Sequence, residues 1–270
     1  MKTLRFLLLT LCVATLAIFV SCDENGDFVV FSIENDKDLG NQLASQIAED
    51  PENYPVLSRT EYAAAYAYLD DMFNEILASE EVTYKDEFDW EIFIINQDVL
   101  NAFAAPGGKI YVYTGLIYFL DTEDDLAGVI GHEIAHADQR HGSKQLQTQY
   151  GISALLSIAL GGQAQSTQTI GQVVAGLGTL SFSRSDEAEA DDLSVRYLAG
   201  IDRYACNGAA SFFEKLLENQ ETRQPEFLST HPDPENRVED INAEAIEIGC
   251  STARDDESVS RYRAFWQDLP

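Results

Sequence analysis

One predicted helix, built around residues 132–136 (His-Glu-Ile-Ala-His), constrains the fold of this chain more than any other segment. Just ahead of it, residues 124–130 begin with two acidic residues and continue as an apolar run, the pattern of a buried helix. Residues four apart share one face of a helix, so His132 and His136 can bind the same metal ion with Glu133 beside them. The alternative is a surface helix with two unrelated histidines. It is disfavoured because the apolar flanking residues would half-bury both imidazoles without partners.

A zinc hydrolase needs three protein ligands and an open position for water, so this pair leaves one ligand to be found. In the metzincin arrangement a third histidine follows the first by ten residues, with glycine at seven. This chain has glycine at position 142 and glutamine at position 139, and His141 is one residue out of register. We interpret His141 as a structural residue at the end of the motif helix, with Gly142 as its C-cap. The third ligand must come from elsewhere.

Residues 183–191 (Ser-Arg-Ser-Asp-Glu-Ala-Glu-Ala-Asp) offer that ligand on a second predicted helix, where Glu187 and Asp191 share one face. In this interpretation Glu187 binds zinc, and Asp191 accepts a hydrogen bond from the far nitrogen of a ligating histidine and so fixes its tautomer. Glu189 points away from that face and competes poorly as a ligand. Without the first motif, an ordinary acidic helix start would be the better interpretation of this segment in so acidic a chain.

Together these residues resemble the gluzincin zinc metallopeptidases related to the bacterial heat-shock protease HtpX and to the eukaryotic CAAX prenyl proteases. The resemblance implies an α+β, mostly α-helical, zincin-like catalytic domain with a small β-sheet and an active-site helix. Four segments carry the resemblance, and together they cover most of residues 95–240. They are 101–104 continuing through 107–115, then 132–136, 183–191 and 229–232.

The resemblance also implies a role for each residue of the two motifs. His132, His136 and Glu187 would bind one zinc ion, Glu133 would be the catalytic base, and Asp191 would support the ligands from behind. The bond to be hydrolysed would then be a peptide bond.

A strand at Asn101 and Ala102 is implied to border the substrate cleft. In the family such a strand pairs with the substrate through backbone hydrogen bonds, which gives weak sequence preference. Judged from its residues alone, the segment would be an ordinary strand or turn.

His231 and Arg237 are two further candidate site residues. His231 lies in a Thr-His-Pro-Asp-Pro turn whose prolines fix the backbone. In relatives the corresponding histidine lies near the metal. There it would either act in catalysis by stabilising the oxyanion, or occupy the open zinc position and keep the enzyme latent. The alternative is that His231 is a purely structural residue of the turn. Arg237, one helical turn into the next element, would either bind a substrate or cleft carboxylate or pair on the surface.

The N-terminal sequence predicts export. A charged start, an apolar run over residues 6–20 and a small residue before Cys22 are typical of a bacterial lipoprotein signal peptide, residues 1–21. Lipidation of Cys22 would anchor the protein in the cell envelope, on the periplasmic or cell-surface face. An uncleaved anchor is disfavoured, since the run has about fifteen residues and a membrane span needs about twenty. We expect residues 22–37 to form an acidic tether and residues 38–270 to form one metallopeptidase domain.

The remaining cysteines and the net charge agree with this location. Cys206 and Cys250 form an even pair that we expect to be bridged in an oxidising compartment, with two buried free thiols as the alternative. The net charge of −29 repels nucleic acid and anionic lipid surfaces. The expected partners are therefore protein or peptide substrates, the membrane through the anchor at Cys22, and envelope assembly machinery as a further candidate.

Hydrophobic periodicity predicts a mostly helical domain with a small sheet ahead of the motif helix. An apolar pair of segments, 150–160 and 169–180, predicts a helical hairpin over the cleft, which would act as a lid or complete the core. The predicted helices are 38–50, 59–79, 186–198, 207–219, 234–248 and 258–267, and the predicted strands are 90–96 and 109–114.

Three functions are compatible with these patterns. The first is a zinc endopeptidase that degrades misfolded or misassembled envelope proteins. The second is a non-catalytic zinc-containing assembly factor or chaperone, against which the retention of Glu133 argues, because zinc binding alone does not need that residue. The third is a zinc hydrolase of another bond type.

Overall fold

The computed structural model describes the chain except for residues 1–20, 23–27, 30, 162–165, 220–226 and 233. The expected signal peptide, apart from Ser21, and much of the expected tether lie outside the described residues. The helices are α1 (Ile33–Ala48), α2 (Ala63–Leu77), α3 (Thr114–Phe119), α4 (Glu123–Asp138), α5 (His141–Tyr150), α6 (Ile152–Ala159), α7 (Ser166–Leu177), α8 (Arg184–Leu198), α9 (Gly208–Asn219), α10 (Phe227–Thr230), α11 (Pro234–Ile248) and α12 (Ser258–Gln267), with a short 3₁₀ turn at Pro106–Gly108. The strands are β1 (Ser21–Cys22), β2 (Phe28–Val29), β3 (Glu91–Ile95), β4 (Ala102–Ala105) and β5 (Lys109–Tyr113). The predicted α+β, mostly helical class is confirmed.

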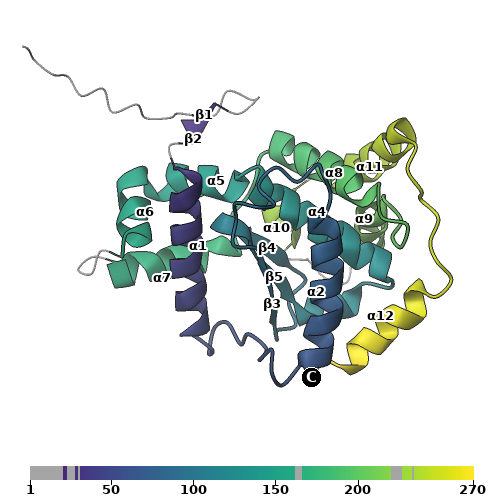
Figure 1. Cartoon of the computed structure of the whole chain (residues 1–270), viewed down its shortest axis with the longest axis horizontal. Coiled ribbons are helices and arrows are strands. Elements are labelled where there is room, and N and C mark those ends of the chain that lie inside the picture. The colour runs from purple at the N-terminus through teal and green to yellow at the C-terminus, as the bar shows by residue number, and fades with distance from the viewer. Residues whose placement is uncertain (1–20, 23–27, 30, 162–165, 220–226, 233) are drawn as a thin grey trace, which may run out of the picture.

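A three-stranded sheet of order β3-β5-β4 lies at the centre of the molecule, between α1 and α2 (Figure 1). β3 runs parallel to β5, and β4 runs antiparallel to it as an edge strand. All five residues of β5 are buried because helices cover both faces of the sheet. Ile110 and Val112 pack in one core with α2, α4, α8, α9 and α12. Tyr111 and Tyr113, on the opposite face, pack in a second core with α1, α6 and α7.

Helix α4 is the central helix of the first core, and every one of its residues is buried. Thr122 and Asp125 form a capping box at its start, which satisfies two of the backbone N–H groups that a helix N-terminus leaves unpaired. It packs closely on α9, since a Cβ built on Gly128 would lie 2.1 Å from the backbone nitrogen of Ala209. A helix held this firmly is a rigid support for the side chains it projects.

The expected domain boundary at residue 38 falls inside α1. The helix begins at Ile33, with Ser32 as its N-cap. Phe31 is buried in the second core, and Asp36 is buried in an ion pair with Arg140, at 2.5 Å. The acidic tether was expected to extend to residue 37, whereas Asp36, one of its acids, has a buried cation as its partner.

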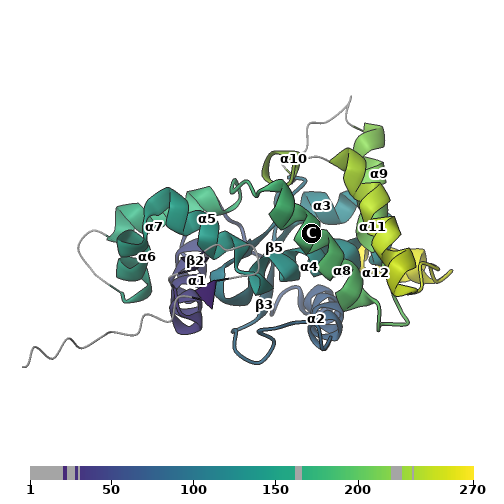
Figure 2. The same cartoon turned by 90° about the horizontal axis from the view of Figure 1, so that it is seen from above.

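The hairpin of α6 and α7 packs against α1 and the second core at one end of the molecule, while α9 and α11 lie at the other (Figure 2). Of the two roles considered for the hairpin, the structure therefore supports completion of the core. No helix in the described ranges has both the length and the apolar character needed to cross a membrane. A disulfide joins Cys206, just before α9, to Cys250, just after α11.

Candidate metal centre

Helices α4 and α8 pack side by side and bring three of the predicted ligands together. Nε2 of His132 lies 3.0 Å from Nε2 of His136. The carboxylate of Glu187, in the first turn of α8, lies 3.5 Å from each of these nitrogens. A capping box formed by Ser183 and Asp186 fixes the start of α8 and so the direction in which Glu187 points.

The side chain of His231, which follows α10, completes a group of four. Its Nδ1 lies 3.0 Å from Oε1 of Glu187 and 3.3 Å from Nε2 of His132. Zinc bonds of about 2.0–2.1 Å in tetrahedral geometry separate neighbouring ligand atoms by about 3.3 Å. Because these five distances between ligand atoms are between 3.0 and 3.5 Å, the four side chains fit one zinc ion.

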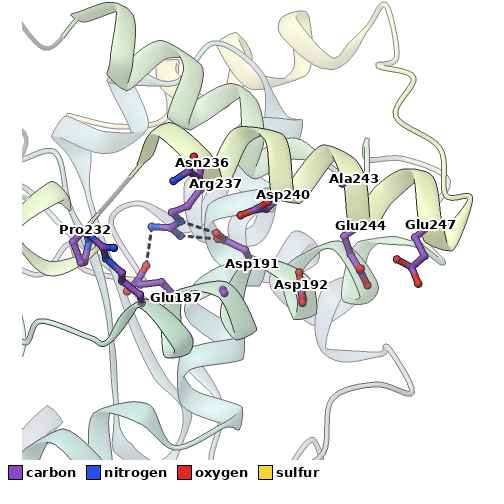
Figure 3. A pocket seen from close by; sticks show the side chains of 12 residues that line it. Glu187, Asp191, Asp192, Pro232, Asn236, Arg237, Asp240, Ala243, Glu244 and Glu247 are labelled. Carbon is purple, nitrogen blue, oxygen red and sulfur yellow. Dashed lines mark hydrogen bonds and ion pairs between the residues drawn. The ribbon is translucent and has the colours of Figure 1, made fainter.

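Asp191 and Arg237 hold this group from behind. Oδ1 of Asp191 lies 2.9 Å from Nδ1 of His132, so it can accept that N–H and leave Nε2 free to bind metal. Arg237 donates two hydrogen bonds of 2.6 Å to Asp191, and its Nη1 lies 2.7 Å from Glu187 (Figure 3). Of the two roles considered for Arg237, the structure shows a buried clamp on cleft carboxylates, with its guanidinium 4.0 Å above the ring of Phe213.

The charges of the site favour ionised carboxylates and a neutral His136. Burial raises the pKa of Glu187, but the nearby His231 charge and hydrogen bonds from three histidines outweigh it and place this pKa well below its usual range. Burial also opposes ionisation of Asp191, yet Arg237 lowers its pKa overall. For His132, burial is outweighed by hydrogen bonds to Asp191 and Glu187, which raise its pKa to about 9. Burial and the adjacent His132 lower the pKa of His136 well below its usual value.

Glu133 lies next to the ligands and differs from them. It is fully buried, and neither of its carboxylate oxygens has a hydrogen-bond partner among the described residues. Nε2 of His231 lies 3.5 Å from its Oε1. Burial raises the pKa of Glu133, which suits a group that must take up and release a proton.

Two segments, residues 178–183 and 227–231, close the centre from solvent and are called the cover below. Phe182 stacks on the His136 ring at 4.1 Å, and Phe227 stacks on the His231 ring at 4.2 Å. The backbone N–H of Phe182 donates to the carbonyl oxygen of Thr230, which links the two segments. All four candidate ligands are at most 2% exposed, so the centre is closed in this structure.

The cover also reaches the edge of the sheet where substrate pairing was predicted. The side chain of Asn101 donates to the carbonyl oxygen of Gly178. The backbone N–H of Phe227 donates to the carbonyl oxygen of Leu100. Ala102, at the start of β4, is fully buried. The predicted substrate strand is thus joined to both segments of the cover, and the carbonyl oxygen of Leu100 just before it is already occupied.

Several contacts at the centre were not predicted. Phe182 and Phe227 carry no spacing signal that would single them out. His141 does not end the motif helix: α4 ends at Asp138, Arg140 adopts a left-handed backbone conformation (φ 59°), and Gly142 lies inside α5 rather than at a C-cap. This sharp turn brings His141 back against His136. The side chain of Cys22, the predicted lipidation site, lies outside what the structure describes.

Peptidase family M48 matches residues 63–245, a stretch that contains every residue of the centre. The chain is 36% identical to the beta-barrel assembly-enhancing protease of Escherichia coli over 175 residues, 59% of this chain and 35% of that protein. It is 30% identical to the mitochondrial metalloendopeptidase OMA1 of Schizosaccharomyces pombe over 186 residues, 67% of this chain and 53% of that protein. The OMA1 of Bos taurus is 27% identical over 227 residues, 71% of this chain and 42% of that protein. The matched stretch thus spans about a third to a half of each relative's own length.

Proposed function

This chain belongs to peptidase family M48, and on that premise we propose that it is a zinc-dependent endopeptidase of the bacterial cell envelope. The observation that carries the proposal is the group of His132, His136 and Glu187 at zinc-ligand distances, with the unpaired carboxylate of Glu133 on the same helix. A non-catalytic zinc protein would have no need of a buried, unpaired glutamate there, since such a group is costly to bury.

The proposed reaction assigns one task to each group. His132, His136 and Glu187 would hold zinc, which when bound acidifies a water molecule and stabilises negative charge on the carbonyl oxygen of the peptide bond. Glu133 would accept the proton of the attacking water and deliver it to the leaving amine. Its raised pKa makes it a stronger base for the first half of this transfer. Asp191 would keep His132 in the tautomer that binds metal.

We further propose that His231 is a displaceable fourth ligand that keeps the enzyme latent. Its Nδ1 lies 3.3 Å from Nε2 of His132 and 3.0 Å from Oε1 of Glu187, so it would take the position that a reacting water needs, and the ring of Phe227 stacks on it there. Activation would then require the second cover segment to move, which would free both the fourth position and the edge of β4.

Envelope proteins are the substrates we propose, with an exposed strand of the substrate pairing at Asn101 and Ala102. The name of the Escherichia coli relative, beta-barrel assembly-enhancing protease, links that protein to beta-barrel assembly and supports this choice. The sequence of residues 1–22 supports export and a lipid anchor at Cys22, and the Cys206–Cys250 disulfide suits an oxidising compartment. A direct partnership with assembly machinery would fit the same location.

Digestion of casein and of envelope proteins tests the activity, with and without a chelator. Glu133→Gln should reduce cleavage by about 10²- to 10⁴-fold while zinc stays bound, because the amide cannot accept the proton. Glu239→Gln, the same chemical change at an exposed position of α11, is the matched control and should cleave normally. Undiminished cleavage by Glu133→Gln would refute the mechanism.

The role of His231 is tested in the same assay. His231→Ala should increase cleavage if the histidine blocks the fourth position. A decrease with zinc still bound would instead show that His231 acts in catalysis, and the latency proposal would be wrong. Glu133→Gln combined with His231→Ala should be inactive in either case.

A further inference from the structure

His141 contacts a zinc ligand and two carboxylates that the proposed reaction does not use. It is the first residue of α5 and is 1% exposed. Its Nδ1 lies 2.9 Å from Nδ1 of His136. On the other side of the ring, its Nε2 lies 3.2 Å from Oε2 of Glu189 and 3.6 Å from Oδ1 of Asp186.

The positions of the protons follow from these contacts. His136 presents its Nε2 to the other metal-binding atoms, so as a neutral ligand it carries its proton on Nδ1. That N–H points at Nδ1 of His141, which must therefore accept it. A neutral His141 then carries its own proton on Nε2, where Glu189 is the acceptor.

We propose that His141 is a positioning residue that fixes the tautomer and ring orientation of His136. Its Nδ1 accepts a hydrogen bond from His136, and its Nε2 donates one to Glu189. The inference rests on the proposed zinc site. It gives both ligating histidines of α4 a carboxylate behind them: Asp191 directly behind His132, and Glu189 behind His136 through one intervening imidazole. Partners of this kind orient a ligand and increase its basicity.

A second metal site is the competing explanation, because His141, Asp186 and Glu189 are close enough to hold an ion. An ion on Nε2 of His141 would require that nitrogen to lose its proton. Since Nδ1 already accepts from His136, the ring would then be an imidazolate anion, which has lost both of its ring protons. A hydrogen bond from Nε2 to Glu189 needs no such ionisation and is therefore favoured.

Zinc affinity, measured by competition with a chromophoric chelator at one pH, tests the proposal. His141→Leu removes the acceptor for the His136 N–H and should weaken zinc binding by about 10- to 100-fold. His141→Asn places its Oδ1 where Nδ1 of the imidazole lies and should stay within about threefold of wild type. Glu189→Ala should weaken binding less than His141→Leu, because Asp186 remains as a second acceptor.

The matched control is Asp192→Ala, which removes one carboxylate from the same helix at a position influenced by Glu244 and Arg196 rather than by His141. It should bind zinc like wild type. Cobalt(II) substitution gives a second measurement: the visible spectrum should shift in His141→Leu and stay unchanged in His141→Asn and in the control. Thermal unfolding of the zinc-free proteins separates these effects from a general loss of stability.

Each outcome decides between the explanations. Equal zinc affinity of wild type and His141→Leu would overturn the proposal, as would a folded His141→Asn as weak as His141→Leu. Two zinc ions per wild-type chain, falling to one in His141→Leu, would establish the second metal site instead. If wild type bound no zinc at all, the proposed function would fail before His141 was tested. If His141→Leu does not fold, His141→Asn and Glu189→Ala still test the proposal.

Discussion

Breaking the Cys206–Cys250 disulfide should lower the free energy of unfolding, and the number of residues between the two cysteines determines by how much. The bridge closes a loop of 44 residues that contains α9, α10 and α11, and therefore His231 and Arg237. In the chain-entropy model a loop of this length restricts the unfolded chain by about 4 kcal/mol. With a urea m value of about 3 kcal/mol/M, the unfolding midpoint should fall by about 1.3 M on reduction.

Urea unfolding of wild type with and without reductant measures this change, and alkylation followed by mass spectrometry shows that both thiols are free. Cys206→Ala combined with Cys250→Ala should unfold near reduced wild type and should not respond to reductant. A shift below about 1 kcal/mol in fully reduced wild type would refute the reasoning, because it would mean that the unfolded chain gains no freedom when the bridge opens.

Three further predictions follow from single contacts. Gly128→Ala should destabilise the protein by at least about 1–3 kcal/mol in urea unfolding and weaken zinc binding, since its Cβ would lie 2.1 Å from the Ala209 backbone. Arg237→Met should lower the free energy of unfolding of the zinc-free protein by about 3–5 kcal/mol, because the buried carboxylates of Glu187 and Asp191 lose their cation. Burial and the nearby Glu244 raise the pKa of Asp192 to about 6 from its usual 3.8, so the contribution of Asp192 to the stability of wild type should fall as pH rises from about 4 to 6. Asp192→Asn should show a smaller fall in thermal unfolding over that range; an equal fall would contradict the assignment.

The ligand group could be predicted because its signals are local. A histidine pair four residues apart and a glutamate and aspartate four residues apart each share a helix face by geometry alone, and the capping boxes at Thr122 and Ser183 mark where those helices begin. What periodicity could not give was the pairing of α4 with α8. The family resemblance supplied that step.

The contacts that sequence reasoning missed depend on backbone turns and on distant partners. The role of His141 depends on the left-handed conformation of Arg140, which the sequence does not signal because arginine rarely adopts it. The sequence does not show that Asp36 belongs to the domain rather than to the tether, because its partner Arg140 lies 104 residues later in the chain. Phe182 and Phe227 cover the centre through the way their loops pack, which follows from the tertiary fold rather than from local spacing.

The cover has a consequence for which chains the proposed endopeptidase would cleave. Among the described residues, two backbone hydrogen bonds join its second segment, residues 227–231, to the rest of the molecule: one with Phe182 and one with Leu100. At about 1 kcal/mol each, these two bonds alone would leave that segment open in about one molecule in 30. An extended chain that offers a free N–H to Leu100 replaces one of those bonds and shifts this population, whereas a chain already paired in a finished sheet has no such N–H to offer. Susceptibility to cleavage would then report how much of a substrate's strand edge is still unpaired, largely independent of its sequence.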